Sequence, residues 1–346
     1  MTAIHDRISF HNVDHLEKKG ELSGLLLQRF PDPIRLALGQ GDHERGRFFA
    51  QVSTGCEIRF VTDAYFYRLS LSSYLEDTHV MIFCGDYLHS VHQIPAGKVT
   101  TLHIEIPPSL FQSESWVREG GRFDCRVWRV LFHKQSCGVF CELDAFGHEV
   151  RPPEPQEVPQ IKWLAYGSSI TFGGDVHLAS NAYVLQAARR LGADVYNKAV
   201  AGSCFCDSAM IEYLSSLKGW DIATLELGIN MLNRFTVEEF ENRSRDLTQA
   251  LLKANPGKPV VLITAYPAHA LFGGNAAQKE KYLAFEEILK KIRQEDKSRC
   301  LHLIEGKDIL RDVQGLTVDM THPSDDGHIM MGQRLAEELE RILKEI

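Results

Sequence analysis

The stretch IKWLAYGSSIT (161–171) decides the fold class of this chain. It begins as a short, mostly apolar strand pattern, and a glycine and two serines follow at once. In an open α/β sheet, ligands bind just beyond the carboxyl ends of the strands. Ser168 and Ser169 therefore stand where a site is expected, provided that the stretch belongs to such a sheet.

The sequence downstream of this stretch alternates between strand and helix patterns. Strands are predicted over 161–167, 193–200, 221–228, 259–266 and 300–306, and helices over 181–191, 210–217, 237–254, 276–296 and 325–344. The run PVVLITAY (259–266) is almost entirely apolar, as in a strand buried on both faces. The alternation predicts one α/β domain over 160–346, with a parallel sheet and helices on both faces.

The sequence upstream follows a different pattern. Short runs rich in β-branched and aromatic residues recur between turn residues, at 56–63, 66–74, 79–88, 98–107, 123–132 and 138–146. They predict an antiparallel, jelly-roll-like β-sandwich over 1–150 as an accessory domain. Residues 151–159, RPPEPQEVP, hold four prolines, which neither continue a helix nor suit a central strand. We interpret 151–159 as a stiff, Pro-rich linker between the domains.

Length and charge agree with two globular domains and exclude several classes of partner. The 346 residues correspond to two domains at roughly 150 residues each. With 38 Lys and Arg against 46 Asp and Glu, the net charge is −8. This charge argues against broad binding to nucleic acid or to an anionic membrane surface. No run approaches the ~18–20 apolar residues of a membrane-spanning helix.

The N-terminus and the cysteines indicate a reducing compartment. Residues 1–20 lack the apolar core and the cleavage site of a signal peptide, so the expected location is the cytoplasm. The eight cysteines are then expected to be reduced thiols. Cys204 and Cys206 are too close for a C-x-x-C zinc pair, and Cys137 and Cys141 lack a second half at finger spacing. We therefore expect no metal site.

Polar residues that follow the predicted strands make a coherent chemical set. Ser169 is a nucleophile that needs a base, and His322 can serve as that base. Asp319 lies three residues before His322, so one turn would bring its carboxylate to the other ring nitrogen. The backbone N–H groups of Ser169 and Gly202 and the amide of Asn230 can donate hydrogen bonds to an oxyanion. The set indicates acyl transfer through a serine.

In this order along the chain, the blocks resemble those of the SGNH, or GDSL-like, hydrolases. GSSIT (167–171) resembles the first block, whose third residue is the nucleophile, hence Ser169. Gly202 matches the glycine of the second block and Asn230 the asparagine of the third, G-x-N. DMTHP (319–323) resembles the last block, D-x-x-H-P. Two positions depart from the family pattern, because Ser168 and Met231 stand where Asp is common.

The resemblance, which covers roughly 160–346, implies a flavodoxin-like hydrolase domain with Ser169, Asp319 and His322 as catalytic residues. Ser169, Gly202 and Asn230 would form the oxyanion hole. Some relatives use a Ser–His dyad, so the need for Asp319 stays open. A β-sandwich before such a domain resembles bacterial carbohydrate esterases that deacetylate xylan-type glycans. We therefore expect an acetyl esterase for carbohydrates such as acetylated xylo-oligosaccharides, with no cofactor and no metal.

Alternatives remain for the substrate and for the accessory domain. The same superfamily includes lysophospholipases, arylesterases and thioesterases, and a silent carbohydrate-binding protein is the option outside enzymes. The expected partner is a small-molecule or oligosaccharide ester, without nucleic acid or membrane, and a homo-oligomer stays open. Core packing is the expected use of four aromatic residues that could instead stack on sugars, Tyr65, Tyr67, Trp116 and Trp128. His328 is expected to be structural, and three residues are expected to line the cleft, Phe172, Tyr266 and Phe272.

Overall fold

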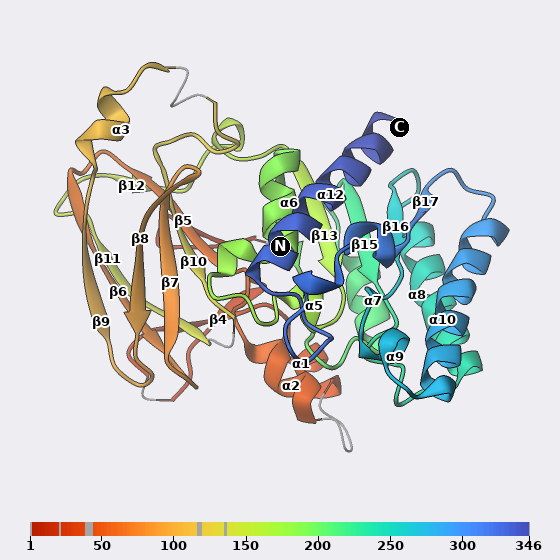
Figure 1. Cartoon of the computed structure of the whole chain (residues 1–346). Coiled ribbons are helices and arrows are strands. Elements are labelled where there is room, and N and C mark those ends of the chain that lie inside the picture. Colours follow the sequence, from red (N-terminus) through yellow and green to blue (C-terminus); the bar gives the residue numbers. More distant parts are fainter. Residues whose placement is uncertain (1, 21, 39–43, 116–119, 135–136, 346) are drawn as a thin grey trace. The chain divides into compact units, whose positions relative to one another are not determined.

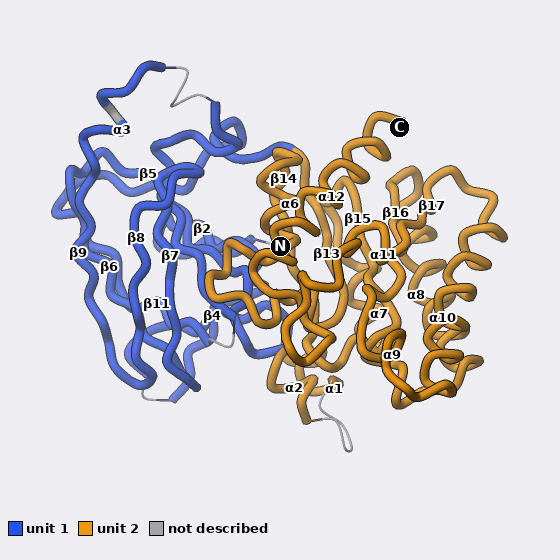
Figure 2. Tube along the Cα trace, viewed as in Figure 1, with its two compact units in different colours: residues 1–31, 50–160 blue, residues 32–49, 161–346 orange. Residues whose placement is uncertain are grey.

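The computed structural model describes residues 2–20, 22–38, 44–115, 120–134 and 137–345 (Figure 1). The chain divides into two compact units (Figure 2). The first unit comprises Met1–Pro31 and Ala50–Gln160, and the second comprises Asp32–Phe49 and Ile161–Ile346. The division differs from the predicted domains, because residues 32–49 belong to the second unit although they lie within the first 150 residues.

Two antiparallel sheets form the first unit. One has the strand order β1-β2-β5-β10-β7-β8, with β12 paired to β5, and the other has the order β3-β4-β11-β6-β9. The strands of the first sheet are β1 (Thr2–His5), β2 (Ile8–His11), β5 (Glu57–Thr62), β7 (Thr78–Cys84), β8 (Tyr87–Ile94), β10 (Val127–Phe132) and β12 (Val150–Arg151). Those of the second are β3 (His15–Glu17), β4 (Leu25–Gln28), β6 (Phe66–Ser73), β9 (Thr100–Glu105) and β11 (Gly138–Asp144).

The core of the first unit lies between these sheets, which confirms the sandwich prediction. Phe60 and Trp128 from one sheet share a buried cluster with Leu69 and Ile104 from the other. The chain passes repeatedly from one sheet to the other, as in jelly rolls. The single strand predicted over 79–88 is a hairpin of β7 and β8 that turns at Gly85 (φ +59°).

The prediction of an all-β segment is wrong at 32–37 and at 44–51. There the chain forms α1 (Asp32–Ala37) and α2 (Glu44–Gln51). This stretch lacks the alternation of a strand, and Arg35 pairs with Asp32 one turn earlier in α1. A short helix, α3 (Pro108–Gln112), also interrupts the strands.

The predicted linker is an ordered part of the first unit. It contains the end of β12 and a 3₁₀ turn, η1 (Pro155–Glu157). The buried Glu157 carboxylate accepts two hydrogen bonds of 2.7 Å from the Arg151 guanidinium. The prolines limit the segment to short elements, and this ion pair fixes its path.

A parallel sheet of order β14-β13-β15-β16-β17 forms the centre of the second unit and confirms the flavodoxin-like prediction. Its strands are β13 (Ile161–Tyr166), β14 (Ala193–Asn197), β15 (Ile222–Glu226), β16 (Val260–Ile263) and β17 (Leu301–Ile304). The order places β13, β14 and β15 side by side. The segments that follow them therefore meet at one edge of the sheet, where the sequence predicts the site.

Helices cover this sheet (Figure 1). The long ones are α6 (Tyr183–Leu191), α7 (Ser208–Ser216), α8 (Val237–Ala254), α10 (Ala276–Glu295) and α12 (Asp325–Lys344). Shorter helices and turns are α5 (Ser169–Phe172), η2 (Ala179–Asn181), α9 (His269–Phe272), α11 (Gly306–Ile309) and η3 (Val313–Gly315). Residues of α6 and α12 share the main buried cluster with Trp163 and Ile263 of the sheet.

No helix in the described residues is long and apolar enough to cross a membrane. All eight cysteines are among the described residues, none of them forms a disulfide, and six of them are buried.

Candidate active site

The first block forms a tight turn between β13 and α5. Ser168 is the N-cap of α5, and its hydroxyl accepts a hydrogen bond of 3.1 Å from the N–H of Ile170. Ser168 thus fills the capping role that an aspartate could also fill, which accounts for the departure at this position. Ser169, the first residue of α5, is half-buried, and its hydroxyl faces His322.

The last block brings the histidine to this serine across the fold. The Nε2 atom of His322 lies 2.7 Å from Oγ of Ser169. The loop that carries His322 is closed at its base, because the Thr317 N–H donates to the His322 carbonyl at 2.8 Å. Leu316 and Pro323 form an isolated bridge just outside this bond. These backbone contacts of the loop therefore fix the position of the His322 imidazole.

Asp319 binds the other side of the imidazole. Its Oδ2 lies 2.5 Å from Nδ1 of His322, while Oδ1 accepts hydrogen bonds from the Thr317 hydroxyl and from the N–H groups of Thr321 and His322. Burial opposes ionisation, but these hydrogen bonds hold the pKa of the carboxyl well below its usual range. Asp175 also approaches, with Oδ2 at 3.5 Å from the same Nδ1.

Gly202 and Asn230 complete the predicted set. Gly202 adopts φ +67°, a left-handed conformation that favours glycine. The Oδ1 atom of Asn230 accepts a hydrogen bond of 3.1 Å from the N–H of Cys204, which leaves the amide NH₂ to donate elsewhere. Met231 is fully buried, so the position that often holds Asp in the family serves packing here.

All five residues predicted for catalysis and the oxyanion hole line one pocket. The pocket has a volume of about 360 Å³, and its lining includes Ser169, Gly202, Asn230, Asp319 and His322. A hydroxyl, an imidazole and a carboxylate in series, beside potential oxyanion donors, can activate the serine for attack on an acyl carbon.

The expected role of three aromatic residues is not found in this pocket. Tyr266 is fully buried and Phe172 nearly so, while Phe272 is half exposed but does not line the pocket. His328, by contrast, is structural as predicted. It is fully buried, its Nδ1 accepts from the N–H of Tyr183, and its Nε2 lies 2.9 Å from the Gly174 carbonyl.

The sequence analysis missed Glu226, which ends β15 beneath the nucleophile turn. Its buried Oε2 accepts hydrogen bonds from the Ser168 N–H at 2.7 Å and from the Thr171 hydroxyl at 3.1 Å. Burial raises the pKa of Glu226 to about 7, against these hydrogen bonds and the field of His322. An acidic residue within the apolar strand DIATLELG was the available signal.

This buried carboxyl predicts a pH dependence of stability. In the folded protein, the pKa of Glu226 lies above its ordinary value of 4.5. The protonated carboxyl therefore contributes to the stability of the fold below pH 4.5, and this contribution is lost as the pH rises through about 7. The shift corresponds to on the order of 3 kcal/mol. Between pH 4.5 and 8, the unfolding free energy of the wild type should fall by this amount more than the unfolding free energy of Glu226→Gln. Urea titrations at the two pH values measure both changes.

The control for this prediction is Glu337→Gln, which removes an exposed carboxylate from α12. It should keep the wild-type pH dependence. Equal slopes for wild type and Glu226→Gln would contradict a raised pKa at Glu226.

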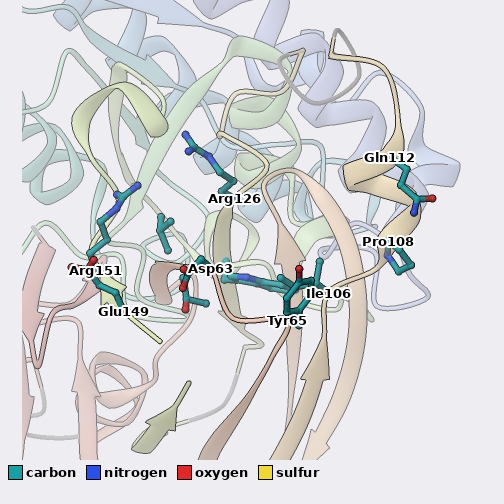
Figure 3. Close-up of a pocket in the computed structure, with 11 residues that line it drawn as sticks. Asp63, Tyr65, Ile106, Pro108, Gln112, Arg126, Glu149 and Arg151 are labelled. Atoms are coloured by element: carbon teal, nitrogen blue, oxygen red, sulfur yellow. The ribbon is translucent and has the colours of Figure 1, made fainter. Parts of the chain in front are cut away.

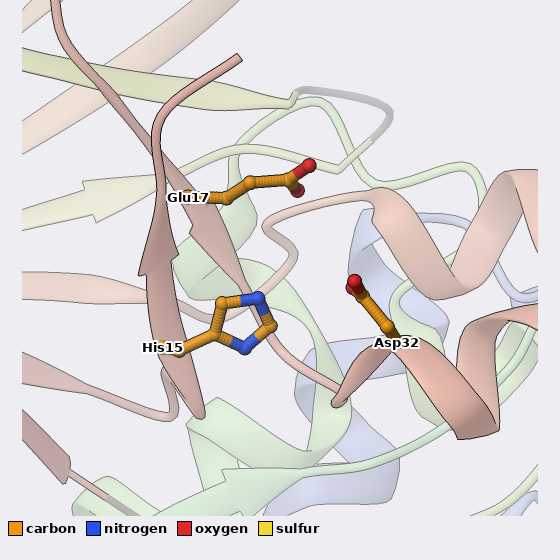
Figure 4. A group of neighbouring side chains, drawn as sticks. All are labelled: His15, Glu17 and Asp32. Carbon is orange, nitrogen blue, oxygen red and sulfur yellow. The ribbon is translucent and has the colours of Figure 1, made fainter.

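Among the described residues, Asp175, Asp319 and His322 of the second unit have metal-ligand composition, but their contacts do not favour a metal site. Asp175, Asp319 and His322 lie close enough together, but the His322 nitrogens already face Ser169 and Asp319. His15 and Glu17 lie on β3 of the first unit, and Asp32 begins α1 of the second unit (Figure 4). Each has a partner within its own unit, since His15 contacts Asp14, Glu17 accepts from Gln28 and Asp32 pairs with Arg35.

A second pocket, of about 650 Å³, lies in the first unit (Figure 3). Tyr65 lines it and is 80% exposed, whereas Tyr67 and Trp128 are buried, as core packing predicts. Trp116 lies outside the described residues. The Arg126 and Arg151 side chains at this pocket are both paired with carboxylates.

The comparison with family models shows the protein family of this chain. Residues 161–344 match the model described as the GDSL-like lipase/acylhydrolase family. This chain belongs to that family. The match covers the second unit from β13 to the end of α12, and hence all five pocket residues that the sequence analysis singled out. No curated protein sequence gives a significant match.

Solved structures resemble both units of this GDSL-like chain. Salicylyl-acyltransferase SsfX3 from a tetracycline biosynthetic pathway has a TM-score of 0.81 at 14% identity, over 99% of this chain and 96% of that one. A family two carbohydrate esterase from Clostridium thermocellum in complex with cellohexaose has a TM-score of 0.60 at 14% identity, over 85% and 94%. An acetyl xylan esterase from the rumen bacterium Butyrivibrio proteoclasticus has a TM-score of 0.56 at 14% identity, over 84% and 91%. At these identities, the likeness shows the fold.

Proposed function

We propose that this chain is a serine esterase that removes acetyl or other short acyl groups from carbohydrates, such as acetylated xylo-oligosaccharides. The observation that carries the proposal is the hydrogen-bonded series of Ser169 Oγ, the His322 ring and the Asp319 carboxylate, with separations of 2.7 and 2.5 Å. The series opens into the pocket that Gly202 and Asn230 also line.

The reaction follows from the roles of these groups. Ser169 attacks the ester carbonyl while His322 takes the hydroxyl proton, and Asp319 stabilises the imidazolium. The Ser169 and Gly202 N–H groups and the Asn230 amide bind the oxyanion. His322 then protonates the leaving alcohol, and the acyl group stays on Ser169. Water attacks the acyl-enzyme, gives a proton to His322 and releases the acid, and His322 returns that proton to Ser169.

The size of the pocket and the structural neighbours support a short acyl group and a sugar. A volume of about 360 Å³ is at the small end of ligand sites and suits acetyl better than a long acyl chain. Two neighbours with the same two-unit fold are carbohydrate esterases by description, one of them an acetyl xylan esterase.

Acyl transfer to an alcohol is the second candidate. The neighbour of the highest TM-score among those described above is an acyltransferase, and its likeness extends over both units. The chemistry differs only in the second step, where an alcohol replaces water as the group that attacks the acyl-enzyme.

The test compares substrates on the purified protein. We expect turnover of 4-nitrophenyl acetate and of acetylated xylo-oligosaccharides, with lower rates on long acyl esters and on thioesters. Cleavage of 4-nitrophenyl acetate without cleavage of the acetylated xylo-oligosaccharides would contradict a carbohydrate substrate and would indicate an arylesterase. Faster consumption with added alcohol, together with a new acylated product, would favour transfer. Inertness toward all of these esters would contradict an esterase and favour a silent binding protein.

The oxyanion role of Asn230 has a separate test. Asn230→Ala should lower kcat by about 10²- to 10³-fold with a small change in KM, because one donor to the developing charge is lost. Steady-state kinetics on 4-nitrophenyl acetate measures this split. Asn233→Ala, at a nearby lining residue with no assigned role in catalysis, serves as the comparison. Equal effects of the two substitutions would argue against the oxyanion role.

A further inference from the structure

The active-site pocket contains a cation that the sequence analysis did not associate with it. Arg45 of α2 lines the pocket together with Ser169 and His322, although it lies far upstream of both in the chain. A Cβ atom added to Gly202 would stand 2.9 Å from Nε of Arg45. The guanidinium group therefore lies directly against the glycine whose N–H is assigned to the oxyanion.

Close packing fixes the helix that carries this arginine. A Cβ on Gly46 would stand 3.2 Å from Cβ of the buried Ser203, so α2 approaches the Gly202 loop more closely than a larger residue would permit. The Phe49 ring meets the ring of Phe172, in the nucleophile helix α5, edge to face at 5.4 Å. Arg45 itself lies over the Phe49 ring at 5.5 Å. Contacts with the Gly202 loop and with α5 thus fix the position of α2, and with it that of Arg45.

Arg45 brings a positive charge to the lining of the pocket. Within the described residues, its contact is with the Phe49 ring, and no carboxylate forms an ion pair with it. The carboxylate that lines the pocket is that of Asp319, whose oxygens are already bound by His322, Thr317 and Thr321. A guanidinium group that no described carboxylate pairs with, beside the reaction centre of a small pocket, is suited to bind a planar anion in bidentate fashion.

We infer that Arg45 selects esters that carry a carboxylate close to the scissile carbonyl. This inference rests on the proposed esterase function and names its substrate class. The carboxylate belongs either to the acyl group, as in a half-ester of a dicarboxylic acid, or to the alcohol, as in an acetylated acidic sugar. Both place an anion beside the carbonyl oxygen that Gly202 binds. Apart from Asp319, which is bound to His322, the lining residues of this pocket carry no carboxylate that would repel such an anion.

The experiment compares each anionic ester with a neutral partner of the same shape. The first pair is 4-nitrophenyl hemisuccinate and its methyl ester, with the charge in the acyl group. The second pair is 2-acetoxybenzoate and 2-acetoxybenzamide, with the charge on the alcohol and next to the ester. The measured quantity is the ratio of kcat/KM for the anionic ester to that for its neutral partner. Arg45→Gln should lower this ratio by about 10- to 100-fold for one pair, which identifies the side that carries the anion.

Two further variants separate recognition from general charge. Arg45→Lys keeps the charge but not the bidentate geometry, and it should lower the ratio by less than Arg45→Gln. Arg47→Gln removes an exposed arginine from the same helix and should leave both ratios unchanged. Unchanged ratios in Arg45→Gln would overturn the inference. So would an equal loss on anionic and neutral esters, which would indicate that Arg45 acts on the oxyanion instead.

A binding measurement distinguishes this inference from the proposed function. Calorimetry measures the affinity of intact 4-nitrophenyl hemisuccinate and of 2-acetoxybenzoate for Ser169→Ala, with and without Arg45→Gln. The added substitution should raise Kd by about tenfold for the preferred ester. If the wild type hydrolyses no ester but this change is seen, the esterase proposal fails and the anion site stands. If esters are hydrolysed and neither Kd nor the ratios change, the anion site alone fails.

Discussion

Ser169→Ala should lower kcat of ester hydrolysis by about 10⁴- to 10⁶-fold, the largest effect expected of any single substitution in this chain. The alanine removes the hydroxyl that lies 2.7 Å from Nε2 of His322, so no acyl-enzyme can form. The oxyanion donors remain, and they account for the activity that survives. Because Ser169 is half-buried at the start of a short helix and Ser168 supplies the cap, the fold should be retained.

Kinetics and mass spectrometry together check this result. Rates on 4-nitrophenyl acetate give the loss, and the mass of the acid-quenched wild type should increase by one acetyl group during turnover. Ser208→Ala, at an exposed serine of α7, is the matched control and should keep full activity. Retention of substantial activity by a folded Ser169→Ala protein would place the nucleophile elsewhere.

Asp319→Asn should lower kcat by about 10³- to 10⁴-fold and thereby decide between a triad and a dyad. Asp319 accepts from Nδ1 of His322 at 2.5 Å, which leaves Nε2 unprotonated and able to take the proton of Ser169. An asparagine amide can donate to Nδ1 and so favour the wrong tautomer. The carboxylate also stabilises the imidazolium that forms in the reaction, and the amide does not.

The neighbouring carboxylate provides the control for this substitution. Asp175 lies 3.5 Å from the same nitrogen, 1 Å farther than Asp319, and its side chain is 47% exposed. Asp175→Asn should therefore lower kcat by less than about tenfold. The measurement is the pH profile of kcat for both variants. Comparable losses would mean that the two carboxylates share the orienting role, and a mild effect of both would support a Ser–His dyad.

Much of the active site was predictable because local patterns determine it. The period of the apolar residues shows which segments are strands, and parallel strands direct their carboxyl ends to one edge of the sheet. Ser169, Gly202 and Asn230 each follow such a strand and therefore had to meet. The spacing of Asp319 and His322 allows their contact within a single loop. The capping residues Thr236 and Ser324 likewise begin α8 and α12 at the predicted positions.

Other features were decided only by the tertiary structure. Residues 32–49 carry no local signal of the unit to which they belong, because the packing of Gly46 and Phe49 against distant residues attaches them to the second unit. The pKa of Glu226 depends on how completely the fold removes its carboxyl from water, which no sequence window specifies.

The sequence by itself thus determined the parallel sheet, the family blocks and the residues that meet at the edge of the sheet. The tertiary structure decided that Arg45 joins them and that Glu226 lies buried beneath the nucleophile. The physical reason is the range of the interactions. Periodicity, capping and strand-end placement act within a few residues of the chain, whereas the burial of Glu226 and the approach of Arg45 depend on segments that only the folded chain brings together.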